Sequence, residues 1–135
     1  MFFQTTLTIP AGTTELAPVS TRLEVAPGIT DYIFVGFPPG PRALARLSIW
    51  RASYQVWPST AGEWFAWDRY VYAFRDRYPI IHEPLEFILK GWNEDDTYSH
   101  DVTFMLTIET APDKEELRQL RRSLQMLGLF RTATP

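Results

Sequence analysis

The chain has 135 residues, enough for one domain with a single core, and 45% of them are hydrophobic while 21% are charged. Its formal net charge of −3 argues against a nucleic-acid partner, because nonspecific binding to phosphates depends on clustered cations. The absence of cysteine excludes disulfides, thiolate catalysis and zinc sites built on sulfur.

The N-terminal segment MFFQTTLTIPAGTTEL has no basic region and no continuous apolar run, so we expect no signal peptide. The sequence also lacks the roughly 20 consecutive apolar residues that a membrane helix needs, and we expect no membrane partner. Arginine far exceeds lysine and prolines are numerous, a composition typical of a GC-rich or thermophilic source.

Eight segments show the alternation of apolar and polar residues that is typical of a half-buried β-strand. The five clearest span residues 32–37, 44–50, 69–75, 85–90 and 101–109, and the three weaker ones span residues 3–9, 21–25 and 53–57. No helical period precedes Pro112, although a parallel sheet would need helices between its strands. Residues 1–111 therefore predict an all-β fold, an antiparallel β-sandwich or jelly roll of about seven or eight strands.

Clusters of proline and glycine separate the expected strands. Residues 37–41, FPPGP, contain three prolines without amide donors, so they predict a rigid exposed turn or an edge. Residues 58–62 predict another loop. Residues 10–18 are similar, and residues 1–18 could form an N-terminal arm that reaches a neighbour.

Residues 112–135 are expected to form one C-terminal helix and a tail. Four leucines recur at helical spacing and predict one apolar stripe: Leu117, Leu120, Leu124 and Leu127. Acidic residues near the start of the helix and arginines further along suit the helix dipole, and Gly128 ends it. The stripe either covers the chain's own sheet, which we favour slightly, or docks on another subunit.

The densest polar segment is GWNEDDTYSH, residues 91–100. A metal-dependent enzyme could use Asp95 or Asp96 with His100 and His82, but the acids lack the spacing of a calcium loop and no second motif fixes the histidines. Asn and Asp side chains also hold turns by accepting hydrogen bonds from nearby backbone amides. We therefore interpret residues 93–96 as the connector of a hairpin and expect no metal and no cofactor.

The sequence has no Gly-x-Ser-x-Gly, no His-Glu-x-x-His and no glycine-rich phosphate loop, so no catalytic residue is predicted. Glu63, Asp68 and Glu83 could in principle serve a glycosidase, but any acidic protein offers such pairs. Aromatic residues gather between residues 50 and 72, and they include four tryptophans: Trp50, Trp57, Trp64 and Trp67. Core packing with a protein interface explains them better than stacking on sugar rings.

Five segments together resemble small β-sandwich proteins encoded among the virion structural genes of tailed bacteriophages, a class that includes auxiliary capsid and decoration proteins. They are IPAGTT, FPPGP, VWP, WNEDDTYSH and the strand VTFMLTIET, between residues 9 and 110. The resemblance implies a non-enzymatic virion protein, made in the host cytoplasm, that forms a symmetric oligomer. Its partners would be the major capsid protein or proteins of the neck and tail.

The sequence leaves two functions open. The first is a virion structural protein that forms a homo-oligomer, with a trimer favoured, through the four tryptophans and the four leucines of the C-terminal stripe. The second is a carbohydrate- or receptor-binding module that uses the aromatic region between residues 50 and 72.

Overall fold

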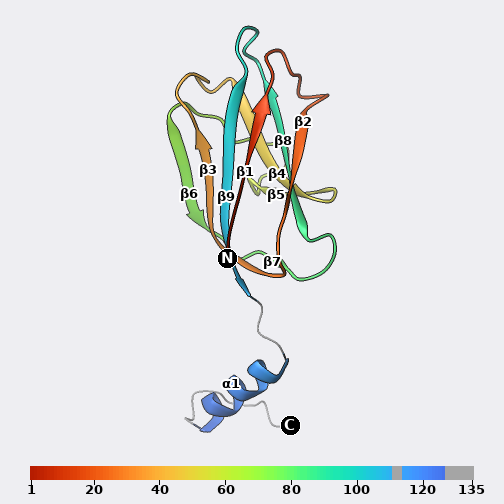
Figure 1. Ribbon diagram of the computed structural model, residues 1–135, viewed down its shortest axis with the longest axis vertical. Coiled ribbons are helices and arrows are strands. Elements are labelled where there is room, and N and C mark those ends of the chain that lie inside the picture. The colour runs from red at the N-terminus through yellow and green to blue at the C-terminus, as the bar shows by residue number, and fades with distance from the viewer. Residues whose placement is uncertain (111–113, 127–135) are drawn as a thin grey trace.

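Two antiparallel β-sheets and one α-helix make up the described part of the chain, which is residues 1–110 and 114–126 of a computed structural model (Figure 1). Sheet A has the order β1 (Phe2–Ile9), β9 (His100–Thr110), β3 (Gly28–Phe37) and β6 (Tyr70–Arg75), with the short β7 (Pro79–Ile80) paired to the start of β3. Sheet B has the order β2 (Val19–Glu24), β8 (Glu86–Asn93), β4 (Ala45–Arg51) and β5 (Tyr54–Trp57). The all-β expectation with antiparallel strands is confirmed.

All eight segments that alternate in the sequence are strands, with ends that differ by a few residues. The ninth strand, β7, has two residues and begins with a proline, so no alternation could reveal it. The loop expected at residues 37–41 is confirmed for residues 38–41, whereas Phe37 is the last residue of β3 and the chain enters β4 at Ala45.

The interpretation of residues 1–18 as an arm is wrong. β1 pairs with β9 along its whole length, from Phe2 opposite Thr107 to Ile9 opposite His100. Leu7 and Ile9 are buried in the core. The segment after β1 is also tied down, since the Gly12 N–H donates to the Asp95 carbonyl over 2.9 Å. The N-terminal residues therefore belong to the sandwich.

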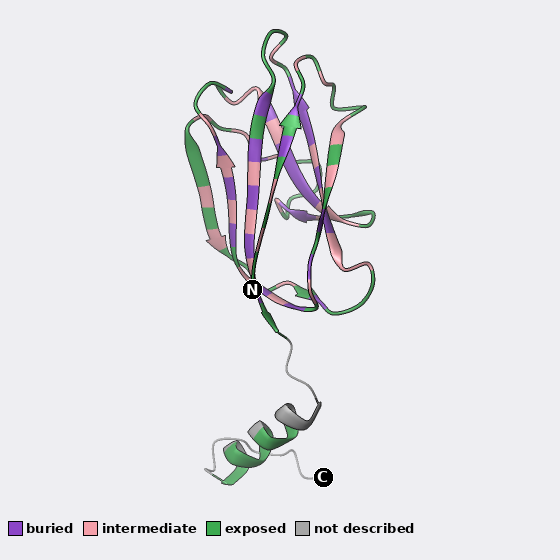
Figure 2. Cartoon of the chain, in the orientation of Figure 1, coloured by how far each residue is buried: buried purple, intermediate pink, exposed green. Residues whose placement is uncertain are grey.

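The core lies between the two sheets and is built from the inward side chains of both. Along β9 the predicted inward residues Val102, Phe104, Leu106 and Ile108 are all buried, whereas the residues between them reach the surface (Figure 2). Phe87 and Leu89 of β8 face them from sheet B and are fully buried. Each such side chain contributes about 1.5–3 kcal/mol through removal of apolar surface from water.

The C-terminal helix α1 (Lys114–Met126) confirms the change of period seen in the sequence. Figure 1 shows α1 beyond the end of the sandwich that carries the N-terminus. The side chains of Leu117, Leu120 and Leu124, and the whole of Leu127, lie outside the described part of the structure, so their role as an interface stays a prediction. Within the described residues, none of the helical segments is long and apolar enough to cross a membrane.

Gly28 provides a test of how tightly β3 and β9 approach each other. A Cβ atom at Gly28 would lie 2.1 Å from the Glu109 carbonyl oxygen, which is backbone and cannot swing away, whereas a Cβ at Gly36 would find its nearest neighbour at 3.8 Å. We expect Gly28→Ala to lower the free energy of unfolding by about 1–3 kcal/mol or more. Gly36→Ala is the matched control and should change little. Urea unfolding of both variants measures the difference, and equal stabilities would contradict the close approach.

Candidate functional site

The polar segment GWNEDDTYSH connects the two sheets. Gly91, Trp92 and Asn93 are the last residues of β8 in sheet B, and His100 is the first residue of β9 in sheet A. The expected hairpin is therefore wrong, because β8 pairs with β2 and β4 while β9 pairs with β1 and β3. Residues 94–99 are instead a loop that crosses from one sheet to the other.

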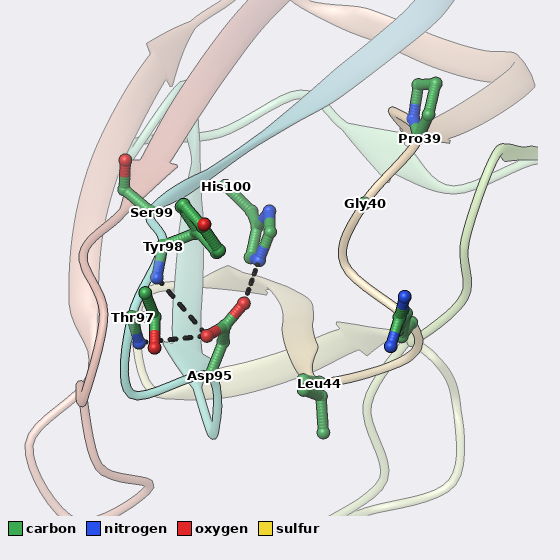
Figure 3. A pocket seen from close by; sticks show the side chains of 9 residues that line it. Pro39, Gly40, Leu44, Asp95, Thr97, Tyr98, Ser99 and His100 are labelled. Carbon is green, nitrogen blue, oxygen red and sulfur yellow. Dashed lines mark hydrogen bonds and ion pairs between the residues drawn. The ribbon is translucent and has the colours of Figure 1, made fainter.

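Asp95 holds this loop closed (Figure 3). Its Oδ1 accepts hydrogen bonds from the backbone N–H groups of Thr97 at 2.9 Å and Tyr98 at 3.2 Å, and its Oδ2 lies 2.9 Å from Nε2 of His100. The N–H of Thr97, then the His100 ring and the N–H of Tyr98 favour the charged carboxylate and lower the pKa of Asp95. The side chain thus acts as a clasp between the loop and the start of β9.

Asn93 supports the same loop from the end of β8. Its side-chain oxygen accepts the Asp95 N–H at 2.9 Å, and its Nδ2 donates to the carbonyls of Tyr98 at 2.9 Å and Ile9 at 3.3 Å. Asn93 is only 1% exposed, so these bonds replace water for a buried amide. The expectation that side chains of residues 93–96 hold a turn is confirmed for Asn93 and Asp95.

A pocket of about 610 Å³ lies between this loop and the proline-rich turn that follows β3. It is lined by Pro39, Gly40, Arg42, Leu44, Asp95, Thr97, Tyr98, Ser99 and His100 (Figure 3). His100 and Asp95 form the kind of pair that transfers protons in enzymes. Here, however, Nε2 of His100 faces Asp95 and the His100 residue is 8% exposed, so the pair presents little of its surface to a ligand.

The opposite wall of the pocket is held by a second carboxylate. Asp68 Oδ1 accepts the backbone N–H groups of Gly40 at 2.7 Å and Arg42 at 3.2 Å. The N–H of Arg42 and that of Gly40 lower the pKa of Asp68 by stabilising its charge. Arg42 and Ala43 have φ angles of 50° and 62°, a left-handed conformation that side chains rarely adopt. Asp68 therefore fixes the turn that follows β3.

The two histidines lie at opposite ends of the sandwich. His82 lies in the segment before β8 and is exposed, whereas His100 begins β9 after the loop that follows β8, and the eight residues of β8 span about 26 Å. Asp96 contacts the hydroxyl of Thr97. Across residues 1–110 and 114–126, no group of three or more acidic or histidine side chains could hold a metal ion. His82 thus does not join His100 in one metal centre.

Trp57 belongs to the core, which corrects its assignment to an interface. It is 1% exposed, and its ring lies 5.4 Å from the Phe87 ring and 6.1 Å from the Phe104 ring, between the two sheets. Its Nε1–H donates to Asp76 Oδ2 at 2.8 Å, which satisfies the buried indole. A side chain enclosed by its own subunit has no surface to offer a partner.

Trp50 and Trp64 are half-buried on the outer face of sheet B. Lys90 Nζ lies 4.2 Å from the centre of the Trp50 ring, and the Trp50 indole donates to Ser48 at 2.8 Å. Trp64 meets Trp92 edge to face with ring centres 6.0 Å apart. Both rings therefore bury much of their surface against their own subunit, and the exposed remainder is what a partner could contact.

Trp67 is 54% exposed and contributes to an aromatic surface beside β6. Its ring lies 6.0 Å from Tyr70, and Tyr70 lies 5.0 Å from Tyr72. These three residues line a shallow pocket of about 210 Å³. We call Trp67 and the β6 residues Tyr70, Val71, Tyr72 and Ala73 the β6 surface.

The non-aromatic half of this surface was not predicted from the sequence. Val71 is 50% exposed, and Ala73 beside it is also exposed. The signal that could have revealed them is the strand YVYAFR itself, in which apolar residues occupy both faces. A strand with one face in water normally carries polar residues on that face.

Comparison with known proteins identifies no family, since neither a protein-family model nor a curated protein sequence matches the chain.

The hydrogen bonds of the charged Asp95 carboxylate make the free energy of unfolding depend on pH. The pKa of Asp95 is lower in the folded chain than the value of about 3.9 expected when unfolded, so its contribution is present above that value and is lost as pH falls through the folded pKa. We expect Asp95→Asn to be less stable than the parent at pH 7, with a gap that narrows below about pH 4. Asp96→Asn, in the same loop, should have little effect. Thermal unfolding from pH 7 to pH 2 measures the difference in stability between the variant and the parent. A difference that does not change with pH would contradict the role of the charged Asp95 carboxylate.

Trp57 and Trp67 form a second matched pair. Trp57→Phe removes buried surface and the hydrogen bond to Asp76, and we expect it to lower the free energy of unfolding by about 1–3 kcal/mol. Trp67→Phe keeps an exposed ring and should stay within about 0.5 kcal/mol of the parent. Urea unfolding followed by circular dichroism measures both, and a larger loss for Trp67→Phe would reverse the assignment of core and surface.

Proposed function

We propose that this protein is a non-enzymatic structural subunit of a virion, which forms a homo-oligomer and binds the capsid surface or the neck and tail. The observation that carries the proposal is the β6 surface, where Trp67, Tyr70 and Val71 expose 54%, 47% and 50% of their area. Aromatic and other large apolar side chains that reach solvent along one strand are typical of protein interfaces. The virion as its location rests on the sequence resemblance.

The strand order supports a jelly roll as the finer description of the sandwich. Four antiparallel pairs are nested in the chain: β1 with β9, β2 with β8, β3 with β6, and β4 with β5. Folding such a nested ladder over itself brings β9 beside β3 in one sheet and β8 beside β4 in the other, as observed. Jelly rolls are common in viral capsid domains and also in lectins.

The polar side chains considered as candidate site residues support a structural role for the protein. Asp95 and Asn93 hold the loop between the sheets, and Asp68 holds the proline-rich turn. Their hydrogen-bonding capacity is used to satisfy backbone amides. The chemistry of these residues is thus explained by the fold, without a substrate.

The alternative is a carbohydrate- or receptor-binding module, and the 210 Å³ pocket lined by Trp67, Tyr70 and Tyr72 favours it specifically. Flat aromatic rings at the surface can stack on the apolar face of a sugar. In this case the β6 surface would receive a glycan where the first proposal places a protein.

Solution mass and glycan titration distinguish the two functions. For an assembly protein, we expect light scattering behind a sizing column to give a stable multiple of 15.6 kDa over a range of concentrations. Tryptophan fluorescence should then stay unchanged when glycans are added. A persistent monomer whose fluorescence responds to a glycan, with the response abolished in Trp67→Ala, would overturn the assembly proposal and support the binding module.

A further inference from the structure

β6 is one of the two edge strands of sheet A, because it pairs with β3 on one side and ends the order of the four main strands. Among the strands of the described chain, β6 is the one without a buried residue, and Figure 2 shows it exposed or half-buried throughout. A free edge presents backbone N–H and C=O groups that can pair with another strand.

Proteins usually block such edges with charges, prolines, bulges or very short strands. The other edges here follow that rule or carry polar side chains. β2 has Arg22 and Glu24 on its outer side, β5 has four residues, and β1 has Gln4, Thr6 and Thr8 on its outer side. Thr6 and Thr8 also hydrogen-bond to side chains of β9, at 3.0 and 2.6 Å.

β6 lacks these protective features. Its pairing with β3 runs without a register shift from Tyr32 opposite Arg75 to Phe37 opposite Tyr70. The strand contains no proline and no lysine, and its single charged residue, Arg75, is already paired with Asp31 at 3.0 Å and lies over the Tyr32 ring. The edge is therefore regular and apolar, and its single charged residue already has a partner within the chain.

The sequence of β6 is complementary to itself when reversed. Residues 70–74 read aromatic, small, aromatic, small, aromatic, with Tyr72 in the centre. Tyr72 and Phe74 pack toward the core, whereas Val71 and Ala73 face outward. In an antiparallel pair of two such strands centred on Tyr72, Tyr70 would lie opposite Phe74, and Val71 opposite Ala73, with matching faces.

We propose that two copies of this chain join through their β6 strands, antiparallel and around a two-fold axis at Tyr72, so that the two A sheets become one continuous sheet. Backbone pairing supplies the hydrogen bonds, and the aromatic and small apolar pairs supply contact on both faces. The contact is isologous and produces dimers or assemblies with even numbers of subunits, in place of the trimer favoured by the sequence.

This inference rests on the proposed function in so far as both require self-association. A pair of charge variants tests it. Val71→Lys with Ala73→Lys creates two lysine–lysine pairs across the contact in the proposed register, whereas Val71→Lys with Ala73→Glu places each lysine opposite a glutamate of the other copy. All four side chains replace exposed residues, so both variants should fold.

Light scattering over a concentration series, with circular dichroism to verify folding, gives the result. We expect the parent and the Lys–Glu variant to have twice the chain mass of 15.6 kDa, and the dissociation constant of the Lys–Lys variant to rise by about 100-fold or more. An unchanged mass for the folded Lys–Lys variant, or loss of the dimer in both variants, would overturn the β6 contact alone. A parent that stays monomeric would overturn the assembly function as well.

Cysteine crosslinking provides a second test that does not depend on charge. The chain contains no cysteine, so Val71→Cys chains mixed with Ala73→Cys chains should form a disulfide-linked dimer between the two kinds. Gln4→Cys on β1, at the other edge of sheet A, is the control and should not crosslink with itself. Crosslinking at Gln4 without crosslinking at β6 would contradict the proposal.

Discussion

The pairing of β9 on both of its sides is the constraint on which the sandwich depends. β9 pairs with β1 from Phe2 to Ile9 and with β3 between Gly28 and Gly36. The last strand of the chain therefore lies inside sheet A, between the first strand and β3. With one side of β3 occupied by β9, the other side is left to β6, and β6 becomes the outermost strand. The free edge that we consider functional is thus a direct consequence of how the first and last strands pair.

The polar residues of the loops serve the same architecture. The chain must leave sheet B after Asn93 and enter sheet A at His100, and the backbone amides of that crossing need acceptors wherever water is excluded. Asp95 supplies them in this loop, and Asp68 supplies them for the turn after β3. Side chains that could suggest a metal centre or an acid–base pair are therefore explained by the hydrogen-bonding demands of the connections.

The alternation of apolar residues predicted the strands well because most strands bury one face, as in β9 with Val102, Phe104, Leu106 and Ile108. Partner choice was less predictable, since adjacency in sequence suggested a hairpin across residues 93–96, while long-range pairing placed β8 and β9 in different sheets. Among the tryptophans, composition could not separate Trp57, which is enclosed by Phe87 and Phe104, from the exposed Trp67. The β6 surface was only half visible, because Val71 and Ala73 look like ordinary strand residues until the edge is known.

Hydrogen exchange at several protein concentrations tests the central claim most directly. If β6 pairs with a second β6, the amides of residues 70–75 that point away from β3 should become more protected as the dimer forms, while amides of β1 at the opposite edge of sheet A stay unchanged. Exchange in β6 that remains fast and independent of concentration, in a sample whose mass shows a dimer, would contradict pairing through this strand.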